Sequence, residues 1–239
     1  MLHSPTVSTI LLVRHGQASA GKADYDVLSS LGEEQARRLG THLVESGQRV
    51  DAVYVGPRKR QRDTARIMAE TAGSVWPAAI ELDALDEYPV ETLFRRNLPA
   101  LLVEEPTLGA AIDPSTPHEE RAAGFDRLLA LGTQRWLDGR LDTTGLPTFA
   151  EFIAKVDAAL VDIARREGRG RHILVVSSAG TISAAVGSTL MSPWEQTLRL
   201  GWQLCNASLS ALKYRDPAAR TLVGFNAVSH LHRHQVTLR

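Results

Sequence analysis

The chain of 239 residues is long enough for one large domain or for a domain that carries a sizeable insertion. Its 27 basic and 27 acidic side chains balance, so the zero net charge predicts no general affinity for nucleic acid or for an anionic membrane. A single cysteine, Cys205, excludes an internal disulfide and a multi-cysteine zinc site. No apolar stretch reaches the length of a membrane-spanning helix, and residues 1–9 lack the basic region of a signal peptide, which predicts a cytoplasmic location.

Short apolar runs rich in β-branched residues predict strands that are buried on both faces. The first run covers residues 9–13, the second residues 51–55, and a third strand is expected over residues 81–85. Residues 172–176 repeat the pattern of the first run. Two strands with alternating polarity, over residues 207–214 and 221–225, are expected to close the chain.

Helical patterns separate these runs. The segment Ser30–Glu33 has the spacing of a capping box and opens a helix that Gly47 ends. Further helices are expected after residues 56–57, after a capping box at Thr148–Glu151, and over residues 182–190. The alternation of strands and helices predicts an α/β fold, a three-layer α/β/α sandwich with a mostly parallel central sheet.

The stretch from residue 89 to residue 147 has a different composition. Prolines interrupt it at positions 99, 106, 114 and 117, and it contains two helix-like pieces, residues 93–103 and 118–137. We interpret it as a helical cap inserted into a single domain that covers residues 1–239, and we expect substrate specificity to reside there. The alternative is that this region merely packs on the sheet.

Polar side chains follow four of the predicted strands, at the points where those strands end. Arg14 and His15 follow the first strand, Arg60 the second, Glu87 the third, and Ser178 the strand that ends at residue 176. In open α/β sheets, ligands bind outside the carboxyl ends of the strands. The five side chains are therefore expected to converge on one crevice.

This set of residue types suits phosphoryl transfer. Guanidinium groups offer paired donors to the charge that spreads over the phosphoryl oxygens in the transition state. A neutral imidazole is a nucleophile near pH 7 when a hydrogen bond holds its other nitrogen, and a protonated carboxyl group supplies the proton that a leaving alkoxide needs. The turn at Ala179–Thr181 would direct helix N-terminal amides toward the same anion.

Six segments, in their order along the chain, resemble the motifs of the histidine phosphatase superfamily, the phosphoglycerate-mutase-like proteins. They are the LVRHG segment at residues 12–16, LSSLG through Gln35 and Ala36 from residue 28, GPRKR with Thr64 and Ala65 from residue 56, LDE at residues 85–87, VVSSAG at residues 175–180 and NAVSHL at residues 226–231. The matches cover nearly the whole chain except the cap. Together they are specific, although RHG alone is a weak signal.

The resemblance implies a role for each matched polar residue. His15 would be phosphorylated, Arg14 and Arg60 would hold the phosphoryl oxygens, and Glu87 would donate and accept protons. The partner would be a small phosphorylated substrate, and no metal or other cofactor would be needed. The resemblance does not indicate an oligomeric state.

The chain departs from the family pattern at the second histidine, which falls on Ser178. A serine hydroxyl donates one hydrogen bond but carries no positive charge, and the loss of a charge-assisted contact costs about 1.5–3 kcal/mol, or roughly one to two decades in rate. After RHG, the usual acidic residue and threonine are Gln17 and Ala18 here. Gln17, Ser19 and the Ala179 turn are therefore expected to contribute substrate contacts.

Three functions follow as hypotheses. The first is a phosphatase that hydrolyses a small phosphomonoester through a phosphohistidine on His15. The second is a phosphoglycerate mutase, although Arg95-Arg96-Asn97 in the cap does not continue into the element typical of those mutases. The third is a weakly active or inactive phospholigand-binding regulatory module. For the cap arginines Arg95 and Arg96, a solvated helix face is favoured over a substrate contact.

Overall fold

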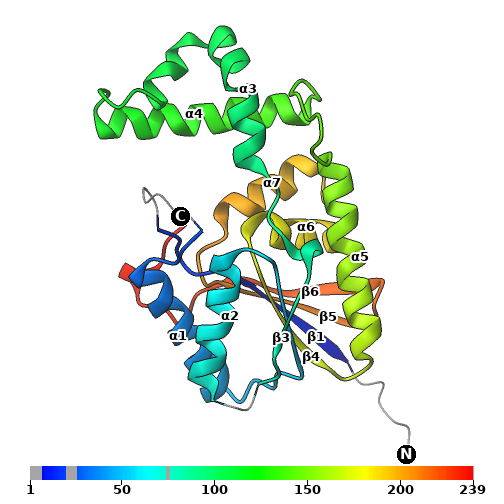
Figure 1. Cartoon of the computed structure of the whole chain (residues 1–239). Coiled ribbons are helices and arrows are strands. Elements are labelled where there is room, and N and C mark those ends of the chain that lie inside the picture. The colour runs from blue at the N-terminus through cyan, green and yellow to red at the C-terminus, as the bar shows by residue number, and fades with distance from the viewer. Residues whose placement is uncertain (1–6, 20–25, 74–75, 239) are drawn as a thin grey trace, which may run out of the picture. The chain divides into compact units, whose positions relative to one another are not determined.

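The computed structural model describes residues 7–19, 26–73 and 76–238 (Figure 1). Its six-stranded sheet has the order β3-β2-β4-β1-β5-β6. β1, β2, β3 and β4 run parallel to one another, while β5 is antiparallel to both β1 and β6. The strands are β1 Ser8–Arg14, β2 Ala52–Val55, β3 Ala79–Glu81, β4 His172–Ser177, β5 Leu209–Asp216 and β6 Ala219–Ala227. The predicted mostly parallel α/β fold is confirmed.

The chain divides into two compact units. The first comprises residues 1–88 and 150–239 and contains the sheet. It also contains α1 Ser30–Glu45, α2 Lys59–Ala72, most of α5 Phe149–Glu167, α6 Ala179–Leu190 and α7 Trp194–Gln203. In Figure 1, α1 and α2 lie on one side of the sheet, and α5 and α6 on the other. This arrangement gives the first unit three layers.

The second unit, residues 89–149, consists mainly of α3 Val90–Glu104 and α4 His118–Leu137. α3 continues through Pro99, and a 3₁₀ helix over Pro106–Ala111 follows it. Trp136 packs edge to face on Phe149, with ring centroids 4.9 Å apart. The two helix-like pieces expected from the sequence are thus both helical. The role of this unit as a cap stays a prediction.

The pairing of the two central strands, β1 and β4, places His15 and Ser178 at the same edge of the sheet. β1 and β4 are almost completely buried, which fits their continuous apolar sequences. Their parallel register pairs Thr9 with His172 and continues without a shift to Arg14 and Ser177. The backbone N–H of His15 then donates to the Ser177 carbonyl at 2.9 Å. His15 and Ser178 therefore follow the ends of two adjacent strands.

Several predicted boundaries differ from the structure, and hydrogen bonds explain two of the differences. The third strand covers Ala79–Glu81 instead of residues 81–85, because the ladder with β2 stops where Leu82 N donates to the Val55 carbonyl. The chain then turns through a 3₁₀ helix, Asp83–Leu85. The cap of α1 is Ser29 and not Ser30, since the Ser29 hydroxyl accepts from Gly32 N at 3.0 Å. α7 was not expected from the sequence.

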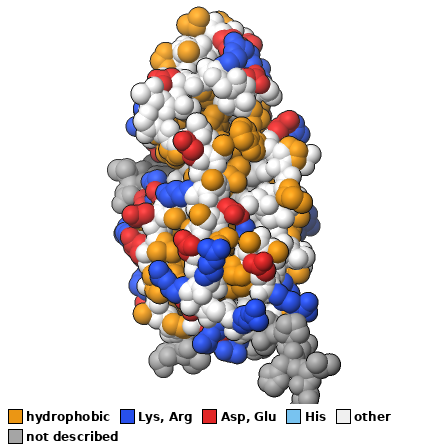
Figure 2. Space-filling model, turned by 90° about the vertical axis from the view of Figure 1, so that its right-hand side faces the viewer, with side chains coloured by type: hydrophobic (Ala, Val, Ile, Leu, Met, Phe, Trp, Pro, Cys, Tyr) orange, Lys and Arg blue, Asp and Glu red, His pale blue; other side chains and the backbone are white. Residues whose placement is uncertain are grey.

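The surface shows no large patch of one charge on the face drawn in Figure 2, where acidic and basic side chains are interspersed. This mixture agrees with the zero net charge of the sequence. No helix in the described parts of the chain is long and apolar enough to cross a membrane.

Gly40 allows α1 and α2 to approach closely on one side of the sheet. A Cβ atom at this position would lie 2.8 Å from the Met68 carbonyl oxygen and 3.1 Å from Met68 Cα, both of which are backbone atoms. Backbone atoms in a packed helix cannot move aside as the end of a flexible side chain can. The glycine is thus required by the packing of the two helices.

We therefore expect Gly40→Ala to lower the free energy of unfolding by about 1–2 kcal/mol, because the cost of overpacking exceeds the gain of about 1 kcal/mol in helix propensity. Urea denaturation followed by circular dichroism measures the change. Thr41→Ala, at the exposed neighbouring position of the same helix, is the matched control and should change stability by less than about 0.5 kcal/mol. An unchanged Gly40→Ala midpoint would contradict the close packing.

Candidate active site

His15 lies just beyond β1 with both ring nitrogens engaged. Its Nδ1 is 2.7 Å from the Gly16 carbonyl oxygen, and its Nε2 is 3.1 Å from Arg60 Nε. A carbonyl only accepts and a guanidinium only donates, so Nδ1 carries the proton and Nε2 presents its lone pair. Burial, with the charges of Arg14 and Arg60, lowers the pKa of His15 well below its ordinary value of 6.5. The ring is therefore a neutral imidazole whose Nε2 presents a lone pair toward Arg60.

Arg60 reaches His15 from the first turn of α2. Its side chain is only 9% exposed, and its Nη1 pairs with Asp26 Oδ1 at 2.9 Å. The same Asp26 carboxylate accepts from the backbone N–H of Lys59 at 2.8 Å, at the start of α2. Asp26 thus neutralises Arg60 and holds the first turn of the helix that carries it.

Arg14 is the last residue of β1. Its Nη1 donates to two backbone carbonyls, those of Leu204 and of Leu238, the latter at 2.8 Å. Its charge is close enough to His15 and to Glu87 to lower the pKa of both side chains. Both arginines predicted to bind phosphate therefore stand beside the imidazole, and each is balanced in this structure by oxygen atoms of the chain.

Glu87 lies on the loop that follows the 3₁₀ helix after β3. Its carboxylate accepts from Tyr88 N at 2.9 Å and from Gly180 N, at the start of α6, at 3.3 Å. A Cβ atom on Gly180 would lie 2.1 Å from Glu87 Oε1, so only glycine leaves room for this carboxylate. Burial raises the pKa of Glu87 above its ordinary value of 4.5, although these N–H groups and the two arginines oppose the change.

The Glu87 loop is tied to the end of β4 and to α2. The hydroxyl of Ser177 donates to the Leu85 carbonyl, and that of Thr181 to the Asp86 carbonyl, each at 2.6 Å. Arg58 forms a two-point ion pair with Asp86, with Nε 2.6 Å from Oδ1. These contacts hold the Glu87 loop, α2 and α6 in a fixed arrangement.

Ser178 caps α6 from a fully buried position. Its side chain makes no capping hydrogen bond and instead accepts from Gln61 Nε2 at 2.7 Å. Gln61 is also fully buried, and its Oε1 accepts from Arg58 N at 3.0 Å. Ser178 thus belongs to a hydrogen-bonded pair that the sequence analysis did not foresee.

The other three predicted substrate contacts lie around the same loops. The Gln17 side chain accepts from the Ser29 hydroxyl at 2.8 Å, and the Ser19 hydroxyl donates to the Leu28 carbonyl at 3.2 Å. These contacts brace the loop after His15. Ala179 is the first residue of α6, beside the Glu87 carboxylate that Gly180 binds. Substrate contacts of Gln17, Ser19 and Ala179 stay predictions.

Two residues of the site were missed from the sequence, Asp26 and Gln61. Asp26 lies in the loop before α1, where no motif marks it. Gln61 lies within the charged run Arg58–Arg62, which the sequence analysis interprets as an exposed basic segment apart from Arg60. Helical spacing places Gln61 on the inner side of α2 together with Thr64, Ala65 and Met68, and this is the signal that could have found it.

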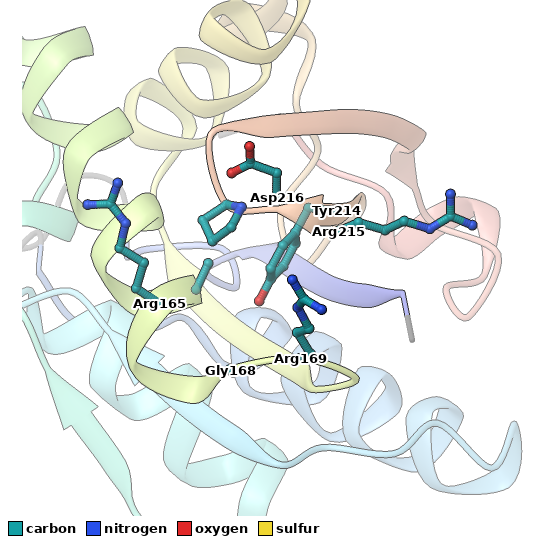
Figure 3. A pocket seen from close by; sticks show the side chains of 8 residues that line it. Arg165, Gly168, Arg169, Tyr214, Arg215 and Asp216 are labelled. Carbon is teal, nitrogen blue, oxygen red and sulfur yellow. The ribbon is translucent and has the colours of Figure 1, made fainter. Parts of the chain in front are cut away.

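Other features do not add to the site. In the described residues, no group of three or more His, Cys, Asp or Glu side chains is placed to hold a metal ion. A hollow of about 350 Å³ around Tyr214 is lined by Arg165, Arg169 and Arg215 (Figure 3). Tyr214 pairs with Ser8 at the start of β1, so this hollow lies at the end of the strand opposite to His15.

The fold and these motifs match a known family. A model of the histidine phosphatase superfamily (branch 1) matches residues 10–99 and 116–227. The chain belongs to this superfamily. The resemblance predicted from the motifs is confirmed at this level, while the replacement of a second histidine by Ser178 stays a prediction.

The histidine phosphatase assignment has one curated relative in support. Over 77 residues the chain is 43% identical to the 2,3-bisphosphoglycerate-dependent phosphoglycerate mutase of Thermobifida fusca (strain YX), a match that covers 29% of this chain and 31% of the mutase. The match therefore spans less than a third of the relative.

Solved structures share this fold over nearly the whole chain. YhfR of Bacillus stearothermophilus has a TM-score of 0.64 at 17% identity and covers 93% of this chain and 98% of its own. A phosphoserine phosphatase of Entamoeba histolytica with bound phosphoserine has a TM-score of 0.64 at 20% identity, with 94% and 100% covered. A mycobacterial glucosyl-3-phosphoglycerate phosphatase has a TM-score of 0.60 at 19% identity, with 92% and 99% covered.

The ion pair between Asp26 and Arg60 leads to a prediction about anion binding. We expect Asp26→Asn to tighten the binding of orthophosphate by about 3- to 10-fold, because one negative charge that competes for the guanidinium is removed. Isothermal titration calorimetry at low salt measures the dissociation constant. Asp63→Asn, an acid further along α2 that pairs with Lys59 and Arg66, is the control and should change it little. Weaker binding by Asp26→Asn would mean that Asp26 chiefly positions Arg60.

Proposed function

We propose that this histidine phosphatase superfamily member hydrolyses a small phosphomonoester through a phosphohistidine intermediate on His15. The observation that carries the proposal is the state of the His15 ring. Its Nδ1 is fixed by the Gly16 carbonyl, and its Nε2 lone pair faces the Arg60 guanidinium, where a bound phosphoryl group would lie. The same contacts thus support His15 as the nucleophile in the correct tautomer and Arg60 as the anion-binding group.

In the first step, His15 Nε2 attacks phosphorus while the bond from phosphorus to the ester oxygen breaks. Arg60 leaves Nε2 and, with Arg14, donates to the phosphoryl oxygens, whose charge replaces that of Asp26 and of the backbone carbonyls. The protonated carboxyl group of Glu87 gives its proton to the departing oxygen. The raised pKa of Glu87 favours the protonated form that this step requires.

In the second step, water attacks the phosphorus of phosphohistidine. Glu87, now a carboxylate, takes a proton from this water as the bond from phosphorus to nitrogen breaks. Orthophosphate leaves, His15 returns to the neutral state, and Glu87 is protonated again. The carboxylate receives N–H groups from Tyr88 and Gly180, which stabilise the charge that Glu87 bears between the two steps.

The first test is the covalent intermediate. We expect the protein to acquire acid-labile label from a ³²P-labelled aryl phosphate, and we expect His15→Ala to lose the label together with at least about 10³-fold in kcat. Alkaline quenching and electrophoresis detect the labelled chain. His234→Ala, at an exposed position in the 3₁₀ helix Arg233–Gln235, is the control and should keep the label. Label that persists in His15→Ala would refute the role of His15.

The second test concerns Glu87. Activity should fall at low pH as His15 is protonated, with a pKa below 6.5, and at higher pH as Glu87 loses its proton, with a pKa above 4.5. We expect Glu87→Gln to remove the high-pH limb and to lower kcat/KM by about 10²- to 10⁴-fold for an alkyl phosphate such as phosphoserine.

The loss in Glu87→Gln should be smaller for p-nitrophenyl phosphate, whose leaving group departs without a proton. Steady-state profiles of kcat/KM against pH, with both substrates, provide the measurement. Glu81→Gln, at an exposed position in β3, is the control. Equal losses for the two substrates, with the high-pH limb intact, would exclude Glu87 as the proton donor.

A phosphoglycerate mutase is the second candidate, favoured by the stretch that is 43% identical to such an enzyme. The cap residues give it less support. Asn97 exchanges hydrogen bonds with the backbone of Asp142, and Arg96 donates to the Thr144 carbonyl, so both side chains brace a loop of their own unit. Assays of phosphoglycerate interconversion, with and without a bisphosphate primer, separate transfer to substrate from transfer to water. Phosphate binding without turnover would instead favour the regulatory module.

A further inference from the structure

The region around Ser178 holds a hydrogen-bond donor whose direction is fixed by the chain. Gln61 Oε1 accepts from the backbone N–H of Arg58, which can only donate. The amide of Gln61 is therefore oriented without ambiguity, and its Nε2 donates to Ser178 Oγ at 2.7 Å. Since Ser178 Oγ is the acceptor in this bond, its own O–H is left as a donor, and no described residue accepts from it.

The backbone at Gly56 leaves space for the hydrogen-bonded pair of Gln61 and Ser178. A Cβ atom on Gly56 would lie 2.2 Å from Gln61 Oε1, so the glycine after β2 makes room for the amide. Gln61 and Ser178 are both fully buried. An amide without solvent must have its hydrogen bonds satisfied by protein, which makes the geometry of this pair rigid.

Two consecutive residues of α2 serve two neighbouring strand ends. Arg60 donates to the Nε2 of His15 after β1, and Gln61 donates to the hydroxyl of Ser178 after β4. Because β1 and β4 are paired in register up to Arg14 and Ser177, His15 and Ser178 lie next to each other. The first turn of α2 thus prepares both the nucleophile and the hydroxyl beside it.

We propose that Gln61 is a positioning residue, which holds the Ser178 hydroxyl so that its O–H donates to an oxygen of the phosphoryl group as it moves to His15. The inference rests on the proposed function and deepens it. Because Ser178 Oγ accepts a hydrogen bond from Gln61, its O–H is polarised and becomes a stronger donor. Ser178 forms no covalent bond in this scheme.

The test compares a transition-state analogue with a ground-state anion. Orthovanadate adopts the five-coordinate geometry of the transferring group, whereas orthophosphate stays tetrahedral. For the full-length protein we expect Ser178→Ala and Gln61→Glu each to lower kcat for p-nitrophenyl phosphate by about 10- to 100-fold, with KM changed by less than about threefold. The ratio of vanadate affinity to phosphate affinity should fall by a similar factor.

Gln61→Glu is the sharpest variant because it reverses one hydrogen bond. Its carboxylate still accepts from Arg58 N, but it takes the Ser178 O–H as an acceptor and removes that donor from the phosphoryl group. Any effect of the added negative charge acts on the binding of both anions, so the ratio of their affinities isolates the lost donor. Gln61→Met, which removes the donor without a charge, should give the same ratio. Gln48→Met, at a partly buried position in the loop before β2, is the control.

The double variant Gln61→Met/Ser178→Ala completes a double-mutant cycle with the two single variants. It should be no less active than Ser178→Ala alone, because Gln61 acts through the hydroxyl. Multiplicative losses, or an unchanged affinity ratio with only a lower melting temperature, would overturn the proposal and leave the pair as a structural bridge between α2 and α6. A wild type without turnover or phosphohistidine refutes the proposed function, and the affinity ratio still decides the role of the pair.

Discussion

The hydrogen bond between Arg60 Nε and His15 Nε2 is the constraint on which the rest of the site depends. Burial lowers the pKa of His15, the charges of Arg14 and Arg60 lower it further, and the other ring nitrogen donates to the Gly16 carbonyl. The bond also places the positive charge of Arg60 against a buried ring nitrogen. The positive charge in turn requires a counter-charge, which Asp26 supplies. The Asp26 carboxylate and the carbonyls bound to Arg14 thus balance the two guanidinium groups from within the chain.

This arrangement follows from the strand order more than from any single motif. β1 lies between β4 and β5, and the parallel pairing of β1 with β4 brings residues that are 163 positions apart, His15 and Ser178, to the same edge. The first turns of α2 and α6 begin beyond this edge, and each contributes donors to it. The loop that carries Glu87 reaches α6 only because Gly180 has no side chain. Strand ends and the first turns of helices thus supply most of these groups, and loops supply the carboxylates of Asp26 and Glu87.

The sequence predicted the elements, and the residues at their ends, correctly where a local pattern is compatible with only one kind of structure. The buried strands β1, β2 and β4 are continuous apolar runs, and the residue after such a run lies at the edge of the sheet, which is why Arg14, His15 and Ser178 could be placed together. β3 escaped correct prediction because it is an exposed edge strand without an apolar pattern. Asp26 and Gln61 were missed because their roles come from partners far away in the sequence, Arg60 for Asp26 and Ser178 for Gln61, and local composition does not encode such pairs. α7 begins after Pro193 in a segment whose exposed tryptophans obscure its pattern.

A neutral hydrogen-bond donor and a charged donor act on a phosphoryl oxygen in different ways, and the proposed role of the buried Gln61 depends on this difference. A charged imidazole attracts a phosphoryl oxygen from many directions, since its field falls off slowly inside a protein. A serine hydroxyl contributes only when its O–H points at the acceptor, because the strength of a hydrogen bond falls steeply with angle. A neutral donor therefore depends on orientation more than a charged donor does. In the role we propose for Gln61, its amide, which is bonded to Arg58 and to Ser178 and enclosed where Gly56 leaves space for it, would supply that orientation within the protein before any substrate binds.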